Sequence, residues 1–395
     1  MNILYVTGLF AQNEKDEKLG GMAKAVYMNA KGMKDRGHNV CVLTVSNRKR
    51  EWEYKGIKVV SVNAEHGIDK SSDLEMIYQI IRREILIEKE IRKISSKKKI
   101  DIIQYTGWFG IGLLHFNRIP TVMRISSYTK AQLECNYSNR RVNILSYIER
   151  LAMKRMNAVY APSRIMAKKI EADIKRKVYV IETPYIQEGV QADETAWRKK
   201  VGEKKYILFF GRISIDKGIY IIKDALYKIL SDYEDIYFVF AGAFDTNGVK
   251  KVELMQAAKE HQKRLIFCGN LSKKQLWPLI EHAYMVLMPS LMDNFPNACA
   301  EAMSLGKIVI GTNGSSLEQF ITDSYNGYLS QIGDSESLIE KIREVLKLEQ
   351  EKKKEISENA KKRIDKLNIN DYCEKMEKMY DTICRKSYFK RGMKK

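Results

Sequence analysis

The sequence has no long apolar run, and this absence limits where the protein can work. No stretch of its 395 residues reaches the roughly 18 apolar residues that a membrane-spanning helix needs. The segment Met1 to Thr7 has the pattern of a strand, and no basic segment precedes it as it would in a signal peptide. We therefore expect a cytoplasmic protein.

Closely spaced cysteines and an Asp-x-Asp pair are also missing. Six cysteines are scattered without a Cys-x2-Cys pair, which argues against both a zinc site and a disulfide framework. No Asp-x-Asp occurs, so nothing indicates a Mg²⁺ ion that bridges a diphosphate. The sequence predicts reduced thiols, no metal and no cofactor.

A further absence concerns the first strand and the helix after it. A strand at 2–7 and a helix at about 22–36 are joined by a loop with Gly20 and Gly21, but no Gly-x-Gly-x-x-Gly stands between them. This counts against a dehydrogenase.

What the chain has in excess is positive charge. A formal charge of +20 predicts attraction to an anionic partner, such as nucleotide phosphates, nucleic acid or an acidic membrane surface. The basic residues form no recognised nucleic-acid motif, and the aromatic residues lie mostly in strand-like runs rather than among them. We expect no nucleic-acid partner.

Short apolar strands alternate with amphipathic helices in both halves of the chain, which is typical of α/β domains with parallel sheets. A polar, strand-poor stretch at 186–204 separates the halves. Strands are expected at 2–7, 37–45, 101–106, 120–126, 157–163 and 178–181, and then at 206–210, 236–242, 265–271 and 283–288.

Two loops of the second half carry charged residues where a buried strand ends. The strand 206–210 runs into Gly211, Arg212 and Lys217, cations that can neutralise a diphosphate. The strand 283–288 runs into a loop with Asp293, followed by a helix that we expect to begin at Pro296 and to carry Glu301 about two turns in. A helix start attracts anions, and carboxylates bind sugar hydroxyls.

This pattern resembles the signature of retaining nucleotide-sugar glycosyltransferases of family 4. The resemblance rests on Pro289-Ser290, Asp293-x7-Glu301-Ala302-Met303 and the Gly-Arg…Lys-Gly loop, and it is strong over 205–330 and weak over 1–185. Asp293 stands where the family usually has a glutamate. The resemblance implies the GT-B fold: an α/β protein with two Rossmann-like domains that face an interdomain cleft.

The resemblance also implies a domain plan. An acceptor-binding domain is expected at 1–185, a linker at 186–204 and a nucleotide-sugar-binding domain at 205–370. A helix and basic tail at 371–395 are expected to return to the first domain.

By resemblance, the catalytic residues are Arg212 and Lys217 at the leaving nucleotide, Asp293 at the donor sugar and Glu301 at the ribose. Arg124 and Ser126 are expected on the acceptor side. Ser126 stands where many members have a histidine, and because a serine is no base near neutral pH, the base must lie elsewhere or be a substrate phosphate. The remaining donor-binding residues implied are Gly20, Gly21, Gly211, Gly269, Asn270, Leu271, Asn294, Phe295 and Asn297.

The implied function is hexosyl transfer from a UDP- or GDP-sugar to a glycan or lipid-linked acceptor, in bacterial surface polysaccharide synthesis. The helix at 73–99 is amphipathic and ends in Lys97-Lys98-Lys99. Two interpretations stay open for it: packing on a core, or peripheral binding to an anionic inner membrane face.

Two other functions remain as alternatives. A sugar-nucleotide epimerase can share this fold and would need an acid or base near the cleft, for which His115 is the candidate in the first domain. A non-catalytic GT-B subunit that binds a partner is favoured by Ser126 and by the high charge.

Overall fold

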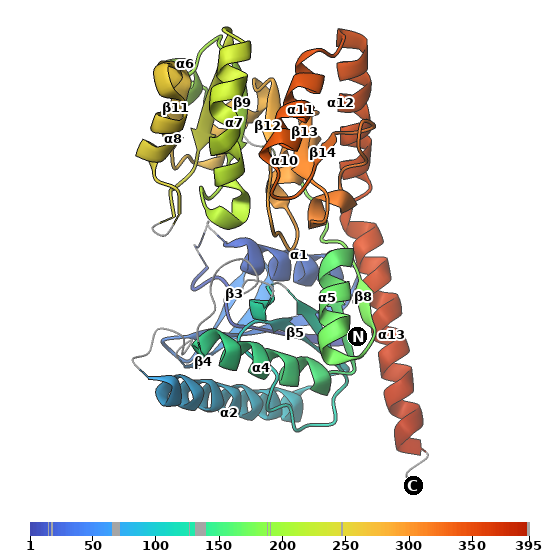
Figure 1. Ribbon diagram of the computed structural model, residues 1–395. Coiled ribbons are helices and arrows are strands. Elements are labelled where there is room, and N and C mark those ends of the chain that lie inside the picture. The colour runs from blue at the N-terminus through green and yellow to red at the C-terminus, as the bar shows by residue number, and fades with distance from the viewer. Residues whose placement is uncertain are drawn as a thin grey trace. The chain divides into compact units, whose positions relative to one another are not determined.

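The structure is a computed structural model that describes residues 1–14, 16, 19–64, 72–125, 127–130, 140–187, 189, 191–245 and 248–392. The chain divides into two compact units (Figure 1). The first combines Met1–Pro184 with Ile369–Lys395, and the second is Tyr185–Asn368. Each contains its own sheet and its own core.

The sheet of the first unit has the strand order β3-β4-β2-β1-β5-β6-β7-β8 among the described residues. Its strands pair in parallel except for β3, which runs antiparallel to β4 at the sheet edge. The bounds are β1 Asn2–Thr7, β2 Asn39–Ser46, β3 Arg50–Tyr54, β4 Ile57–Asn63, β5 Ile102–Gly107, β6 Thr121–Ile125, β7 Ala158–Ala161 and β8 Val178–Val180.

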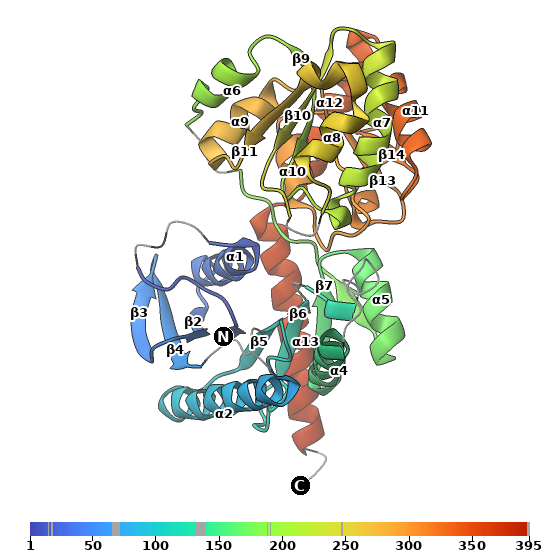
Figure 2. The ribbon, with the colours of Figure 1, turned by 60° about the vertical axis from the view of Figure 1, so that its left-hand side comes forward.

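Helices cover both faces of this sheet (Figure 2). Apolar residues recur at helical spacing along α1, and they share a core with residues of α13. On the other face α2 and α4 pack together through Met76, Ile80, Leu145 and Ile148. The bounds are α1 Gly21–Asp35, α2 Asp73–Lys97, α4 Arg140–Arg155, α5 Arg164–Ile174 and α13 Ile369–Gly392.

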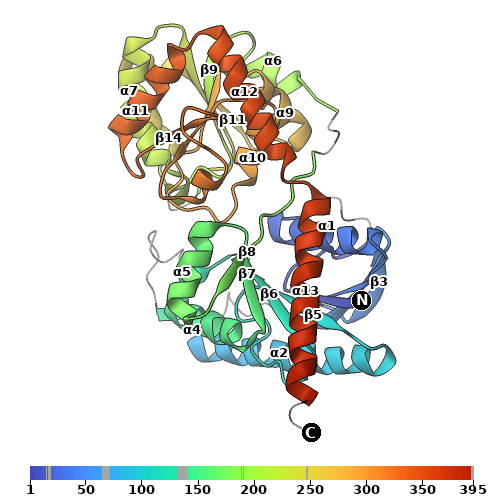
Figure 3. The same cartoon turned by 90° about the vertical axis from the view of Figure 1, so that its right-hand side faces the viewer.

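The second unit contains a parallel sheet with the order β11-β10-β9-β12-β13-β14, which is the doubly wound order 3-2-1-4-5-6. Figures 2 and 3 show α7 and α11 side by side on this sheet. Its strands are β9 Lys205–Phe210, β10 Ile236–Ala241, β11 Leu265–Gly269, β12 Met285–Leu287, β13 Val309–Thr312 and β14 Tyr328–Ser330. Its α-helices are α6 Thr195–Lys200, α7 Ile219–Asp232, α8 Lys251–Ala257, α9 Lys273–Glu281, α10 Asn297–Ser304, α11 Ser335–Leu346 and α12 Gln350–Asp365.

The carboxyl-terminal helix belongs to the first unit (Figure 3). It begins at Ile369, two residues before the expected 371. Tyr372 and Tyr380 are buried against the sheet, where the Tyr372 hydroxyl lies 3.0 Å from that of Tyr160 and the Tyr380 hydroxyl donates to Gln104. The chain thus crosses back to complete the core of its first unit.

Two local features differ from the sequence-based expectation. The stretch 186–204 was expected to be a linker, but it carries α6, whose Trp197 is buried in the core of the second unit and stacks on His282 with ring centroids 3.9 Å apart. The hairpin β3–β4 was not predicted. Its two-residue turn has positive φ at both Lys55 (47°) and Gly56 (79°), as a type I′ turn requires, and Lys-Gly is a weaker signal than Asn-Gly.

Candidate active site

The strands β9 and β12 lie side by side at the point where the strand order of the second sheet reverses. Ligands of doubly wound sheets bind beside such a point, at the carboxyl ends of the strands. The loop after β9 carries Arg212 and Lys217, and the loop after β12 carries Asp293. The fold therefore brings the two charged loops predicted from the sequence to one place.

The two loops are tied together through their backbones. The Leu291 amide donates to the Asp216 carbonyl at 2.9 Å. Gly218 has a φ of 74°, and a Cβ placed there would meet the Pro289 carbonyl oxygen at 1.9 Å. Only glycine allows both this conformation and this close approach, so Gly218 sets the spacing between the loops.

The cation of one loop is paired with the acid of the other. Lys217 Nζ forms an ion pair with Asp293 Oδ2, and the two side chains are 28% and 18% exposed. Arg212 is 59% exposed; it lies 2.8 Å from Asp216 Oδ2 and 3.9 Å from Asp245 Oδ2. Lys217 is thus held in place at the switch point, whereas Arg212 remains open to a ligand from solvent.

The helix after the Asp293 loop begins one residue later than expected. Pro296 precedes the first helical residue, Asn297, and its carbonyl accepts from the amides of Cys299 and Ala300. Glu301 is the fifth residue of α10 and lies just over one turn into the helix, where it is partly exposed. The expected two turns was an overestimate, because even from Pro296 the five-residue separation is less than two turns.

The other predicted donor residues of this loop differ in their surroundings. Asn297 is exposed and Asn294 is partly buried. Phe295 packs edge-on against Phe320, with ring centroids 4.9 Å apart, so its ring supports the loop from within.

The predicted nucleotide-base segment lies at the same edge of the sheet, beyond β10. Gly269 ends β11 with a φ of 69°, Asn270 is exposed and Leu271 packs partly on the core. Gly211, which follows β9, donates its amide to the Ala241 carbonyl at 2.9 Å.

Two acids that contact Arg212 were not identified as site residues from the sequence. Asp216 and Asp245 contact Arg212, and Asp216 could have been found because it stands inside the Arg212–Lys217 motif. Beyond β13, the Thr312 hydroxyl donates to the Ser290 carbonyl at 2.6 Å, and Glu318 accepts from the Gly314 amide at 2.6 Å. Glu318 therefore holds the turn after β13.

In the first unit, Gly20 and Gly21 lie at the start of α1, where Gly20 is the N-cap and a Cβ on it would meet no atom within 4 Å. Arg124 is 4% exposed at β6 and donates to the Thr183 hydroxyl at 2.8 Å. The acceptor-side role of Arg124 stays a prediction. Ser126 lies outside the described residues.

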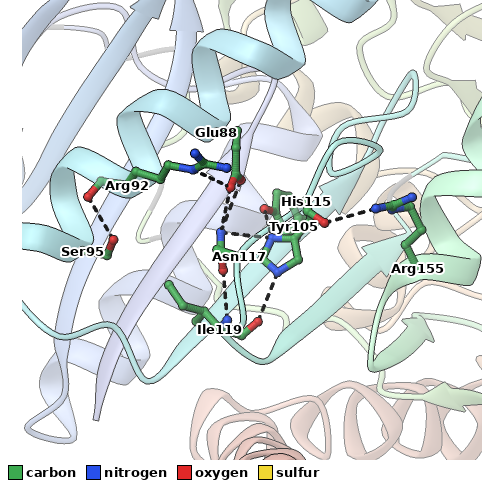
Figure 4. A network of polar contacts seen from close by, with 8 residues as sticks. All are labelled: Glu88, Arg92, Ser95, Tyr105, His115, Asn117, Ile119 and Arg155. Carbon is green, nitrogen blue, oxygen red and sulfur yellow. Dashed lines mark hydrogen bonds and ion pairs between the residues drawn. The ribbon is translucent and has the colours of Figure 1, made fainter.

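His115, the candidate base of an epimerase, is a partly buried residue within a network of polar contacts (Figure 4). Its Nε2 lies 3.2 Å from the Ile119 carbonyl oxygen and its Nδ1 3.0 Å from the Tyr105 hydroxyl. Burial lowers its pKa to about 4, so the ring is neutral near pH 7. Ile119 lies two residues before the start of β6, so His115 lies near the amino-terminal edge of the sheet, not by the carboxyl-end loops.

Two further observations concern the described part of the chain. No three His, Cys, Asp or Glu side chains gather there into a group that could hold a metal ion. Within the same residues, none of the helices has the length and apolarity needed to cross a membrane.

Comparison with known proteins places this geometry in a family. The family model described as Glycosyltransferase Family 4 matches residues 19–185, and the one described as Glycosyl transferases group 1 matches residues 192–363. The chain belongs to the family-4 glycosyltransferases and has their GT-B fold.

Individual proteins are similar over most of the chain. An uncharacterized glycosyltransferase of Methanocaldococcus jannaschii is 25% identical over 78% of this chain and 80% of its own length. The GPI3 subunit of the Saccharomyces cerevisiae phosphatidylinositol N-acetylglucosaminyltransferase is 22% identical over 92% of this chain and 77% of its own length. The Anabaena protein HepE, solved in complex with UDP-glucose, superposes with a TM-score of 0.69 at 16% identity, over 97% of this chain and 100% of that one.

Proposed function

We propose that this glycosyltransferase is a retaining hexosyltransferase that uses a UDP- or GDP-sugar as donor. The observation that carries the proposal is the Lys217–Asp293 ion pair at the switch point of the second sheet. It sets a cation suited to a diphosphate directly beside an acid suited to sugar hydroxyls. A nucleotide-diphosphate sugar presents both groups within one molecule.

In the proposed reaction the bond between the sugar C1 and the diphosphate oxygen breaks first, and its electron pair leaves with the nucleotide. Arg212, Lys217 and the amides at the start of α10 stabilise the negative charge that grows on the diphosphate. The acceptor hydroxyl then bonds to C1 from the face that the diphosphate leaves, and its proton passes to a phosphate oxygen. No protein base is required.

The acceptor we propose is a glycan or a lipid-linked sugar, in bacterial surface polysaccharide synthesis at the inner membrane face. The GPI3 relative, whose enzyme is named for a phosphatidylinositol acceptor, supports a lipid-linked acceptor. The lysines at the end of α2 support a position beside anionic lipid, because they are exposed on the first unit.

Product stereochemistry tests the proposal. The purified protein is incubated with a panel of α-linked nucleotide sugars and a lipid-linked acceptor extract, and the new linkage is assigned by NMR. We expect one donor to give an α-linked product. A β-linked product would show inversion, and a protein that binds donors but consumes none would instead be a non-catalytic subunit.

A further inference from the structure

A hollow lies in the first unit, at the edge of its sheet where the parallel strands begin. It has a volume of about 180 Å³, and its lining comes from the first residues of β1, β2 and β4 and from the end of α2. Because these strands are parallel, their starts meet at one edge. Within the first unit, the hollow therefore lies at the opposite edge of the sheet from the loop that follows β1.

The floor of this hollow is apolar. Leu4 of β1 lies opposite Cys41 of β2, and Cys41 lies opposite Lys58 of β4. Val60, two residues after Lys58, therefore lies on the same face of the sheet as Leu4 and Cys41. Leu4 and Val60 are each 1% exposed, and Ile94 of α2 closes the side. α2 packs along β4, which holds the helix end over these strands (Figure 1).

The rim of the hollow is strongly cationic. Five lysines and one acid, Glu51, line it, and three of these lysines are paired with acids. Lys58 is paired with Glu51 at 2.9 Å. Lys97 and Lys98 are exposed, and neither has an ion-pair partner among the residues that the structure describes. The remaining rim lysines are Lys93, which pairs with Glu90 at 3.7 Å, and Lys99, which pairs with Asp101 at 3.2 Å.

From this arrangement we infer that the hollow binds a small anionic amphiphile, an alkyl chain that ends in a phosphate or carboxylate. An apolar cavity of about 150 Å³ is large enough to bind benzene, so this hollow can take a short length of alkyl chain. The anionic end then lies among the rim lysines, where the two unpaired ammonium groups receive it. Neither inorganic phosphate nor a neutral amphiphile satisfies both parts of the hollow.

The inference rests on the hollow alone and not on glycosyl transfer. Calorimetry of the full chain with octyl phosphate, below its micelle concentration, tests it. We expect saturable binding of one molecule per chain, and binding at least about tenfold weaker for inorganic phosphate and for octyl glucoside. Equal affinity for inorganic phosphate would reduce the hollow to a surface phosphate site, and no saturable binding of octyl phosphate would overturn the inference.

Two exposed lysines allow a variant that should fold normally. Lys97→Gln with Lys98→Gln is expected to weaken octyl phosphate binding roughly 5- to 30-fold. The matched control, Lys175→Gln with Lys177→Gln, removes two exposed lysines of the same unit away from the hollow and should bind as the parent does. Equal binding by parent and rim variant would contradict the inference. So would rim-dependent binding to anionic vesicles without any binding of octyl phosphate, because the lysines would then serve a membrane surface only.

Discussion

At the scale of single residues, the central feature is that Lys217 and Asp293 neutralise each other in a partly buried position. Each residue alone would be costly to hold there, because a partly desolvated charge without a partner is destabilising. The pair keeps both side chains in one geometry before a ligand arrives. In the proposed function, a diphosphate then shares Lys217 while Asp293 turns to the sugar hydroxyls.

A prediction at this scale compares two acids, Glu301 and Glu318. Glu301→Ala should weaken nucleotide binding and abolish transfer, because Glu301 lies on α10 beside the Asp293 loop. Glu318→Ala should affect nucleotide affinity less, because Glu318 accepts from the Gly314 amide and holds a turn. Calorimetric titration with UDP and GDP measures both variants. Parent-like nucleotide affinity in Glu301→Ala would remove its proposed role at the ribose.

The charged residues of the site could be predicted from the sequence, whereas their partners could not. Arg212, Lys217 and Asp293 follow buried strands, and a parallel sheet brings such positions to one edge. Lys217 and Asp293 are 76 residues apart in the sequence. Their ion pair forms only because the fold places β9 beside β12. Burial of Arg124 and the packing of Phe295 on Phe320 depend on tertiary contacts that no local pattern encodes.

At the scale of elements, α13 is fastened to the first unit by charge as well as by its buried tyrosines. Glu377 accepts from Arg36 at 2.8 Å and lies 2.8 Å from His38 Nε2. The hydrogen bond from Arg36 lowers the pKa of Glu377 to about 2. A carboxylate with a lowered pKa stabilises the fold above its unfolded pKa, and this contribution is lost as the pH falls.

Glu377→Gln should therefore destabilise the protein in a pH-dependent way. We expect a loss of about 0.5–1 kcal/mol at pH 7, in view of the partial exposure of the pair. The difference between parent and variant should shrink as the pH falls from about 4.3, the ordinary value for glutamate, toward 2. Urea unfolding at a series of pH values measures it. A difference that stays constant down to pH 3 would mean that the carboxylate charge is not what fastens the helix.

The elements themselves were predictable to different degrees. The ten strands expected from the sequence were placed to within a few residues, because their apolar runs are short and bounded by glycine or polar residues. No strand was predicted at β13 or β14, which are only four and three residues long. The hairpin β3–β4 was missed because Arg50–Tyr54 is an edge strand with three exposed residues and no apolar run. Helix α6 was missed because a six-residue helix has too few positions to show a period.

At the scale of the whole molecule, the absence of an Asp-x-Asp pair in the sequence gives a prediction about metal ions. If Arg212, Lys217 and the start of α10 carry the diphosphate charge, turnover should persist in EDTA. The measurement is nucleotide release with and without chelator. Complete loss of activity in EDTA, restored by Mg²⁺ or Mn²⁺, would contradict the metal-free mechanism.

A second prediction at this scale concerns the membrane. Each lysine near an anionic surface contributes about 1 kcal/mol, so Lys97→Glu with Lys98→Glu and Lys99→Glu should weaken binding to anionic vesicles by several-fold to hundreds-fold. Raised salt should have the same effect on the parent, while nucleotide binding, which belongs to the second unit, should not change. Equal co-sedimentation of parent and variant at low salt would assign these lysines to a solvated surface.

The central claim is that Lys217, at the switch point of the second sheet, stabilises a leaving nucleoside diphosphate. Mass spectrometry of the nucleotide released from a panel of nucleotide sugars tests this claim most directly. It compares the parent with Lys217→Ala and with Lys228→Ala, a lysine on α7 that pairs with Glu336 outside the site. The account predicts that one donor is consumed, that Lys217→Ala turns it over about 10²–10³-fold more slowly, and that Lys228→Ala matches the parent. Parent-like turnover by Lys217→Ala would contradict it.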